Sequence, residues 1–315
     1  MLEKIILAKP RGFCAGVERA IDIVERVLAR HGAPVYVKHE IVHNRHVVDD
    51  FRRRGAVFIE SPDEAPEGAV LIYSAHGVSQ QVRRLADVRR QQIYDATCPL
   101  VTKVHSEIVR LRAAGYAVVM IGHRGHPEVE GALGQCEDGM YLVESEDDVR
   151  ALPSLPQAAF VTQTTLSVDD TAKIAELLKQ KFPHIRAPRR DDICYATQNR
   201  QNAVKRMAKQ CDIILVVGSA ASSNSNRLCE VAVQAGGRAH RIDSADDITP
   251  EWLANARTAG VTAGASAPEP LVQGVVARLQ QRFPGCVLEE MDGEDEKVVF
   301  VVPKSLSRAT GVSPS

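Results

Sequence analysis

The segment DDICYATQNR, residues 191–200, holds a single cysteine, Cys194, at the head of a helical pattern. No second cysteine lies two or three positions away, and no nearby histidine completes a metal-binding spacing. The same arrangement occurs around Cys14, in PRGFCAGV, and around Cys98, in DATCPLV. An arrangement that recurs at long, similar intervals predicts one structural unit repeated three times.

Each repeat continues with the same features in the same order. Apolar residues at helical spacing follow Cys14 as far as Gly32 and follow Cys98 as far as Gly115, and the pattern after Cys194 is weaker. Next come a strand with a polar loop, a strand that ends in serine and acidic residues, and a third strand with its loop. The corresponding residues are His43, His126 and Ser222 in the first loop, Ser61, Ser145 and Ser244 after the second strand, and His76, Thr164 and Ser266 in the last loop.

Helices that alternate with short apolar strands are typical of parallel sheets covered by helices. We therefore expect an α/β fold of three similar small domains, with mainly parallel sheets, arranged around a pseudo-threefold axis. The expected divisions are residues 1–97, 98–193 and 194–290. Residues 291–315 are expected to form a C-terminal arm, in which KVVFVVPKSL is strand-like and the end past Ser305 is predicted to be disordered.

Composition limits the class of protein. The chain has 315 residues, is 44% hydrophobic and carries a net charge of -1, so neither nucleic acid nor a membrane surface is favoured as a partner. No apolar run approaches the ~18 residues of a membrane helix, and the start does not resemble a signal peptide. We expect a cytoplasmic protein whose thiols stay reduced, so its seven cysteines favour metal binding or catalysis over disulfides.

The three repeated cysteines are predicted to meet. Ligands of parallel sheets bind beyond the carboxyl ends of the strands, and each cysteine and its two loops follow strands. A cysteine at a helix N-terminus is expected to have a lowered pKa, and three thiolates together require a soft metal or an iron–sulfur cluster. Three ligands leave one coordination position open for a reactant. The alternative is that all three are core residues, as we expect for the unmatched cysteines, Cys136, Cys211, Cys229 and Cys286.

The polar loops predict a site for a compact anion such as a phosphate or diphosphate. GSAASSNSN and AGAS supply hydroxyl, amide and backbone N–H groups, and the other two repeats supply histidines and threonines. Glu128, in GHPEVEG, is the one acid with a suggestive setting. Because a partly desolvated carboxyl has a raised pKa, Glu128 is the candidate proton donor.

The motifs PRGFCAGV, HEIVHNR, SAHGVS, DATCPLVTKVH, GHPEVEG, TQTTLSVDD, DDICYATQNRQ, GSAASSNSNRL and VTAGASAP together resemble those of the 4-hydroxy-3-methylbut-2-enyl diphosphate reductases. The resemblance runs from about residue 5 to residue 303, with every motif in order. It implies one [4Fe–4S] cluster per chain, held by Cys14, Cys98 and Cys194, with a fourth iron that binds the substrate hydroxyl. It also implies that the diphosphate is held by His43, His76, His126, Thr164, Ser222, Ser223, Asn224 and Ser266.

The resemblance further implies a reductive dehydroxylation, in which two electrons and two protons remove the hydroxyl as water and yield isopentenyl or dimethylallyl diphosphate. Glu128, Thr164 and His126 would carry the catalytic roles in proton delivery, and ferredoxin or flavodoxin would donate the electrons. The main alternative is a non-catalytic α/β protein with zinc held by three thiolates and a histidine. A nucleotide-dependent enzyme is disfavoured because no glycine-rich phosphate-binding motif follows a strand.

Overall fold

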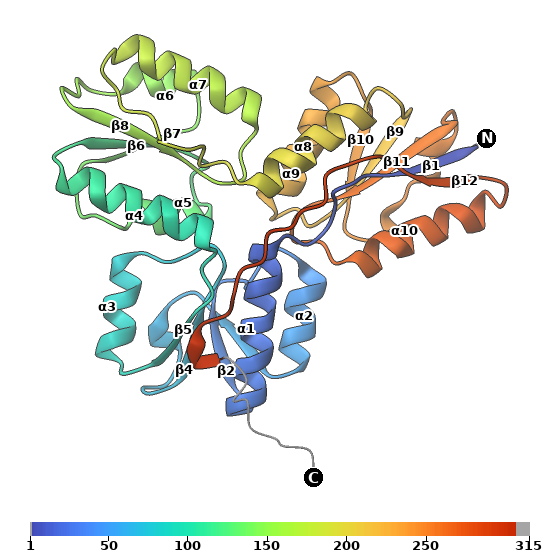
Figure 1. The fold of residues 1–315 in the computed structure, drawn as a ribbon. Helices are drawn as coiled ribbons and strands as arrows, with labels where there is room; N and C mark the ends of the chain where they lie inside the picture. Colours follow the sequence, from blue (N-terminus) through green and yellow to red (C-terminus); the bar gives the residue numbers. More distant parts are fainter. Residues whose placement is uncertain (1, 307–315) are drawn as a thin grey trace.

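The computed structural model describes residues 2–306, which form three α/β lobes around a common centre (Figure 1). Each lobe has its own sheet, and all strand pairs in the three sheets are parallel. The prediction of three small parallel sheets covered by helices is therefore confirmed.

The first lobe has the strand order β3-β2-β4-β5. Its elements are α1 (Ala15–His31), β2 (Val35–Lys38), α2 (Arg45–Arg53), β3 (Ala56–Ile59), β4 (Val70–Tyr73), α3 (Gln80–Val88) and β5 (Gln92–Asp95). Helix α1 ends at Gly32, whose positive φ of 71° suits glycine, and it packs its apolar face on the sheet.

The second lobe has the strand order β7-β6-β8. Its elements are α4 (Pro99–Ala113), β6 (Ala117–Ile121), α5 (Pro127–Leu133), β7 (Met140–Val143), α6 (Glu146–Ala151), β8 (Ala158–Thr162) and α7 (Val168–Lys181). Pro99 occupies the first position of α4, where its missing N–H has no helical partner to lose.

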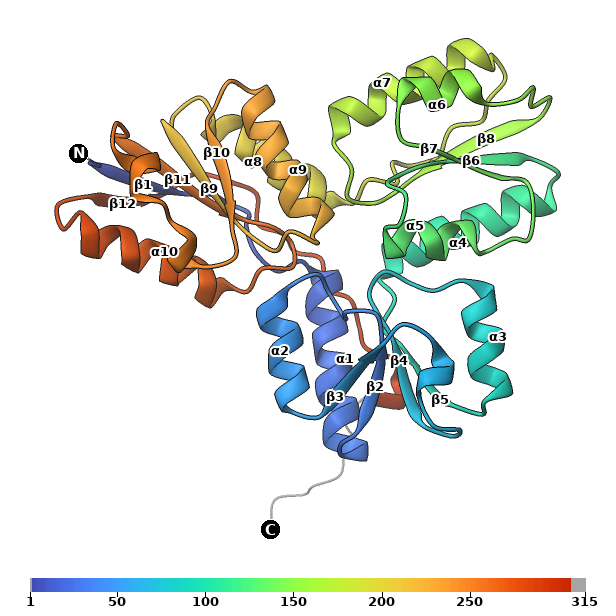
Figure 2. The same cartoon turned by 180° about the vertical axis from the view of Figure 1, so that it is seen from behind.

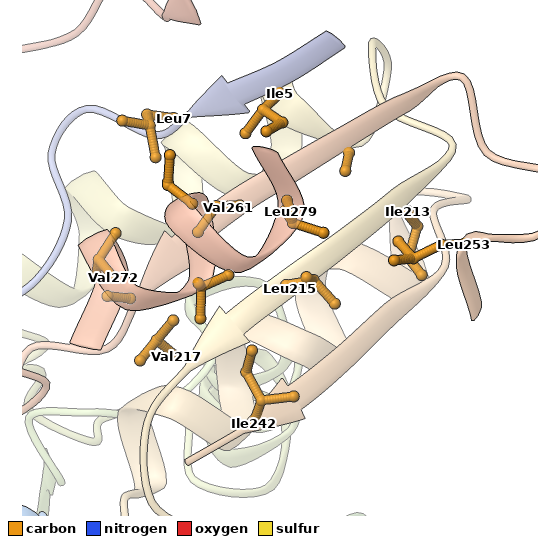
Figure 3. Close-up of a cluster of buried hydrophobic side chains, with 14 of the residues drawn as sticks. Ile5, Leu7, Ile213, Leu215, Val217, Ile242, Leu253, Val261, Val272 and Leu279 are labelled. Atoms are coloured by element: carbon orange, nitrogen blue, oxygen red, sulfur yellow. The ribbon is translucent and has the colours of Figure 1, made fainter. Parts of the chain in front are cut away.

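The third lobe has the strand order β10-β9-β11-β1-β12. Its elements are β1 (Lys4–Leu7), α8 (Tyr195–Met207), β9 (Ile213–Val217), α9 (Ser223–Gln234), β10 (Ala239–Ile242), β11 (Thr258–Ala263), α10 (Glu269–Arg282) and β12 (Val287–Glu290). Strand β9 is buried along its whole length, as expected for a parallel strand covered on both faces. Figure 3 shows one of these faces, where side chains of β1, β9 and β11 pack against α10.

The three serines of the repeats begin short helical turns. An acidic side chain three residues on accepts the N–H of each serine, at 2.7 Å for Ser61, 2.9 Å for Ser145 and 3.1 Å for Ser244. This is the capping box, which satisfies backbone donors that a helix start leaves free. The repeated Ser–acid pattern therefore has a local structural role.

Two expectations about the chain ends need correction. Strand β1 pairs with β11 and β12, so residues 4–7 belong to the third sheet although the expected first unit, 1–97, contains them. Residues 291–303 form no strand: the segment runs extended from the third lobe to the first and ends in a 3₁₀ turn, Lys304–Leu306 (Figures 1 and 2). Leu306, at the end of this segment, is buried in the first lobe. The remaining divisions stay predictions, and the expected disorder past Ser305 falls mostly outside the described residues.

Candidate active site

One cavity receives side chains from all three lobes. It encloses about 680 Å³ free of protein atoms, including its mouth. All of the residues predicted for the site line it: Cys14, Cys98, Cys194, His43, His76, His126, Glu128, Thr164, Ser222, Ser223, Asn224 and Ser266. The repeat therefore does bring together residues that are far apart in the sequence.

The three repeated cysteines occupy equivalent positions. Cys14, Cys98 and Cys194 are the N-cap residues of α1, α4 and α8, whose first turns lie near the middle of the molecule in Figure 1. The sulfur of Cys98 lies so close to Gly16 that a β-carbon there would approach it to 2.8 Å. Gly16 thus leaves the space in which the thiols of Cys14 and Cys98 come together, which suits a shared ligand.

The expected lowering of the thiol pKa is wrong for two of these cysteines in the ligand-free protein. Burial, together with the neighbouring cysteines, raises the pKa of Cys98 to about 12 and that of Cys194 to about 11. Backbone and hydroxyl donors at the helix starts oppose this change but do not outweigh the loss of water. The thiolate forms therefore need a positive partner inside the cavity.

Three histidines form a cluster on the cavity wall. The rings of His43 and His76 stack with centroids 4.1 Å apart, and His126 meets them edge-on at 5.2 Å and 5.8 Å. Burial, followed by the other histidines, holds the pKa of His76 well below its usual range and lowers that of His126 to about 3. Both rings are neutral near pH 7 without a ligand, so they offer hydrogen bonds and not fixed charge.

Glu128 is a buried acid held by a single partner. Its side chain is 4% exposed, Oε1 accepts the Thr164 N–H at 2.6 Å, and Oε2 accepts the Thr164 hydroxyl at 3.0 Å. Burial raises the pKa of Glu128 to about 7, even though both hydrogen bonds favour the charged form. His126, the N-cap residue of α5, accepts the Glu128 N–H at 3.1 Å and fixes the turn that carries the acid.

Hydroxyl and amide groups complete the wall at the start of α9. Ser222 is the N-cap of this helix, and the Ser266 hydroxyl lies 3.4 Å from it while donating to the His43 carbonyl at 3.0 Å. Asn224 is 4% exposed, and neither its amide nitrogen nor its amide oxygen has a protein partner. His43 Nε2 is likewise buried and unpartnered. Buried polar atoms of this kind usually have partners, so these indicate a polar ligand.

The geometry does not suit a single metal ion. Among residues 2–306, no three His, Cys, Asp or Glu side chains lie close enough to hold one. Thiolates on one zinc would stand roughly 4 Å apart, because each Zn–S bond is about 2.3 Å long. All seven cysteines are free, and the four unmatched ones pack in apolar clusters, as expected of structural residues. The zinc-binding alternative is therefore not favoured.

Sequence reasoning missed one polar residue beside the thiols. Thr197 is fully buried, lines the cavity, and donates its N–H to the Cys194 sulfur at 3.4 Å. Its position in the first turn after Cys194 was the available signal, since first-turn N–H groups face the N-cap side chain.

Within residues 2–306, no helix has the length and apolar character needed to cross a membrane.

Known proteins of one family are similar to this chain over most of its length. Residues 5–280 match the family model described as LytB protein. A 4-hydroxy-3-methylbut-2-enyl diphosphate reductase of Bordetella pertussis is 61% identical over 307 residues, covering 97% of this chain and 94% of that protein. One from Escherichia coli O1:K1 is 58% identical over 308 residues, covering 96% and 97%.

Two solved structures extend the likeness to the fold. The E-1-hydroxy-2-methyl-but-2-enyl-4-diphosphate reductase of Plasmodium falciparum has a TM-score of 0.94 at 39% identity, over 97% of each chain. A second, described as (E)-4-hydroxy-3-methyl-but-2-enyl diphosphate reductase, the terminal enzyme of the non-mevalonate pathway, has a TM-score of 0.64 at 30% identity and covers 89% of this chain and 100% of that one. With the matched model spanning most of its length, this chain belongs to the LytB protein family.

Proposed function

We propose that this protein reduces (E)-4-hydroxy-3-methylbut-2-enyl diphosphate to isopentenyl diphosphate and dimethylallyl diphosphate. Two electrons and two protons enter, the C–O bond of the hydroxyl breaks, and the hydroxyl leaves as water. The observation that carries the proposal is the shared cavity, where three thiols, three clustered histidines and a buried acid face the same space. Relatives named for this reaction, 61% and 58% identical, support it.

Cys14, Cys98 and Cys194 would hold one [4Fe–4S] cluster. Each cysteine of such a cluster ligates a different iron, so its sulfurs stand further apart than the ligands of one ion. The three thiols on one cavity, the space beside Gly16 and the absence of a single-ion site within residues 2–306 all fit this group. When bound, the cluster would supply the electrons and a Lewis-acidic iron for the hydroxyl oxygen. A ferredoxin or flavodoxin would be the electron donor.

The polar wall would hold the diphosphate through neutral donors. The residues on this wall come from loops of the first lobe and from the start of α9 and a loop of the third, so a bound diphosphate would join the two lobes: His43, His76, Ser222, Ser223, Asn224 and Ser266. Asn224 and His43 present buried atoms that have no protein partner, and hydrogen bonds to a charged ligand are stronger than those between neutral groups. The cavity-lining set contains no lysine or arginine. Because the diphosphate charge is not cancelled, it would raise the proton affinity of the neighbouring histidines.

Glu128 would supply the proton to the substrate carbon skeleton. With a pKa of about 7, its carboxyl is protonated in a large fraction of molecules at neutral pH. Thr164 holds both carboxyl oxygens and lines the cavity itself, which fixes the direction of the acid. His126 would help by contacting the diphosphate and by fixing the backbone of Glu128.

The test is an anaerobic assay with a chemically reduced electron donor and the hydroxylated diphosphate, combined with iron and sulfide analysis of the same preparation. The proposal expects a brown protein with about four iron and four sulfide per chain that forms both products. A protein that contains iron and sulfide but does not consume the substrate would refute the assigned reaction. A colourless protein that contains only zinc would refute the cluster as well.

A further inference from the structure

Each helix that begins at a repeated cysteine carries a basic residue in its second turn. These residues are Arg19 on α1, Lys103 on α4 and Arg200 on α8. None of the three lines the cavity. Each side chain instead crosses to the backbone segment that leads into the next cysteine.

Arg19 connects the first cysteine helix to the lead of the second cysteine. Its Nη1 donates to the carbonyl of Thr97, the residue directly before Cys98, at 3.0 Å, and its Nη2 donates to the Asp95 carbonyl at 3.4 Å. Its Nε donates to the Val301 carbonyl of the C-terminal segment at 3.0 Å. The guanidinium therefore bridges α1, the end of β5 and the C-terminal segment.

Lys103 connects the second cysteine helix to the lead of the third cysteine. Its Nζ donates to the carbonyls of Arg190 and Asp191 at 3.1 Å and 3.0 Å, and to Asp192 Oδ1 at 3.2 Å. The other oxygen of Asp192 accepts the Thr162 N–H at 3.1 Å at the end of β8. The single ammonium group of Lys103 thus donates three hydrogen bonds to the segment that leads into Cys194.

Arg200 closes the circle by connecting the third cysteine helix to the lead of Cys14. It is fully buried, with Nη2 donating to the Gly12 and Phe13 carbonyls at 2.8 Å and 3.3 Å and Nε donating to Gly12 at 3.2 Å. Its charge is matched by Glu296 of the C-terminal segment, 3.0 Å away. A buried charge with every donor engaged in this way fixes its partners firmly.

The three bridges run in one direction around the centre, from the first cysteine to the second, the second to the third, and the third to the first. The lobes share no sheet, so the strand pairing inside each lobe cannot set the distance between thiols of different lobes. The bridges act on the residues adjacent to each cysteine, where a small displacement of the backbone moves the sulfur. Figure 1 shows the C-terminal segment passing between the third and first lobes, where it backs two of the bridges.

We propose that Arg19, Lys103 and Arg200, which we call the basic ring, are positioning residues that hold the three thiols at the separation the cluster requires. This inference rests on the proposed function, because it takes the cluster as the ligand of the thiols. The ring acts before the cluster is present, through hydrogen bonds to the segments that lead into the cysteines.

Lys103 offers the most accessible test because its own side chain is 39% exposed, whereas Arg200 is fully buried. Its partner Asp192 has a fully buried side chain, so replacement of Lys103 leaves that carboxyl with the Thr162 N–H as its hydrogen-bond partner. Lys103→Met keeps the length of the side chain and removes the donors, while Lys103→Arg restores a charged donor. Lys205→Met is the control for loss of a half-exposed lysine: Lys205 lies on α8, is 34% exposed and pairs at 2.6 Å with Asp169, which is 51% exposed and lies away from the cysteine leads. Two quantities are measured anaerobically, the rate of iron transfer from the loaded protein to a chelator and the hydrogen–deuterium exchange of the 188–196 peptide in cluster-free protein.

We expect iron loss and exchange in the 188–196 peptide to be about tenfold faster in Lys103→Met, because hydrogen bonds to a charged group are lost. Lys103→Arg should return both rates toward wild type, and Lys205→Met should leave both unchanged. Rates in Lys103→Met equal to those in Lys205→Met would overturn the inference. A wild-type protein without iron would refute the proposed cluster, and the exchange measurement would still decide whether Lys103 orders the lead of Cys194.

Discussion

Replacing Glu128 with glutamine should raise stability and abolish most of the activity. The substitution keeps the shape of the side chain and an acceptor for the Thr164 N–H, but removes the titrating proton. Glu128 is 4% exposed and its pKa is raised by burial to about 7, from an ordinary value of 4.5. The removal of water around this carboxyl group explains both its cost to stability when ionised and its capacity to carry a proton near neutral pH.

The size of the change in the free energy of unfolding follows from the ordinary and the raised pKa of Glu128. Between pH 4.5 and pH 7 the folded protein keeps a proton that the unfolded chain has released, so stability falls as the pH rises through this window. Ionising the buried carboxyl therefore costs about 3 kcal/mol above pH 7. Glutamine has no such cost, so the cluster-free variant should be more stable than wild type by about 2–3 kcal/mol at pH 8, and should show no advantage at pH 4.5.

The activity changes in the opposite direction. A positioned proton donor contributes about 10²–10⁴-fold to a rate, so turnover of Glu128→Gln should fall by that factor while iron content and affinity for inorganic diphosphate stay at wild-type values. Turnover of wild type should decline as the pH rises through about 7, where the donor loses its proton. The residual turnover of the variant should lack this decline.

The assays are urea unfolding of cluster-free protein across pH 4.5 to 8 and anaerobic turnover of the loaded protein. Glu128→Asp, which keeps a carboxyl but shortens the side chain, serves as the control that separates the charge from the shape. If Glu128→Gln turned over at a near-normal rate, Glu128 would not be the proton donor. If its stability advantage did not grow between pH 4.5 and pH 7, the raised pKa would be wrong.

Three further predictions concern the same cavity. Gly16→Ala should lower the iron content per chain, measured by colorimetric analysis, because its β-carbon would lie 2.8 Å from the Cys98 sulfur; unchanged iron would show that this space is not needed. Asn224→Ala should weaken binding of inorganic diphosphate about tenfold by calorimetry, while stability changes by less than about 1 kcal/mol because the amide has no protein partner to lose. In wild type, the pKa of His126 is lowered to about 3 in the folded state, so the ring stays neutral where the unfolded chain already takes up a proton. The free energy of unfolding therefore falls as the pH drops below 6.5. Between pH 6.5 and pH 5, the free energy of unfolding measured in urea should therefore fall by about 2 kcal/mol less in His126→Asn than in wild type. An identical fall in both proteins would contradict the neutral histidine.

Much of the fold could be predicted because the relevant signals are local. The helix starts at Cys14, Cys98 and Cys194 and the capping boxes at Ser61 and Ser145 depend on residues within one turn. The strands were recognisable as short apolar runs bounded by polar loops. The composition of the cavity could be predicted as well, because equivalent loops of a repeated unit leave their sheets at the same edge.

The pairing of strand β1 could not be predicted in the same way. Its residues precede Cys14, so the order of the chain places them with the first lobe, but they pair with β11 and β12 in the third. Only the contacts between β1 and these strands near the other end of the chain reveal the pairing. The C-terminal segment likewise has a strand-like sequence, but residues 291–303 form no strand.

The sequence by itself determined the threefold repeat and the helix starts, since each depends on neighbours along the chain, and the repeat in turn indicated most of the polar residues that line the cavity. Only the tertiary structure decided the electrostatics: the raised pKa values of Cys98, Cys194 and Glu128, and the lowered one of His126. The physical reason is that an ionisable group responds to how much water surrounds it. That quantity is set by atoms from all three lobes together, and no local pattern records it.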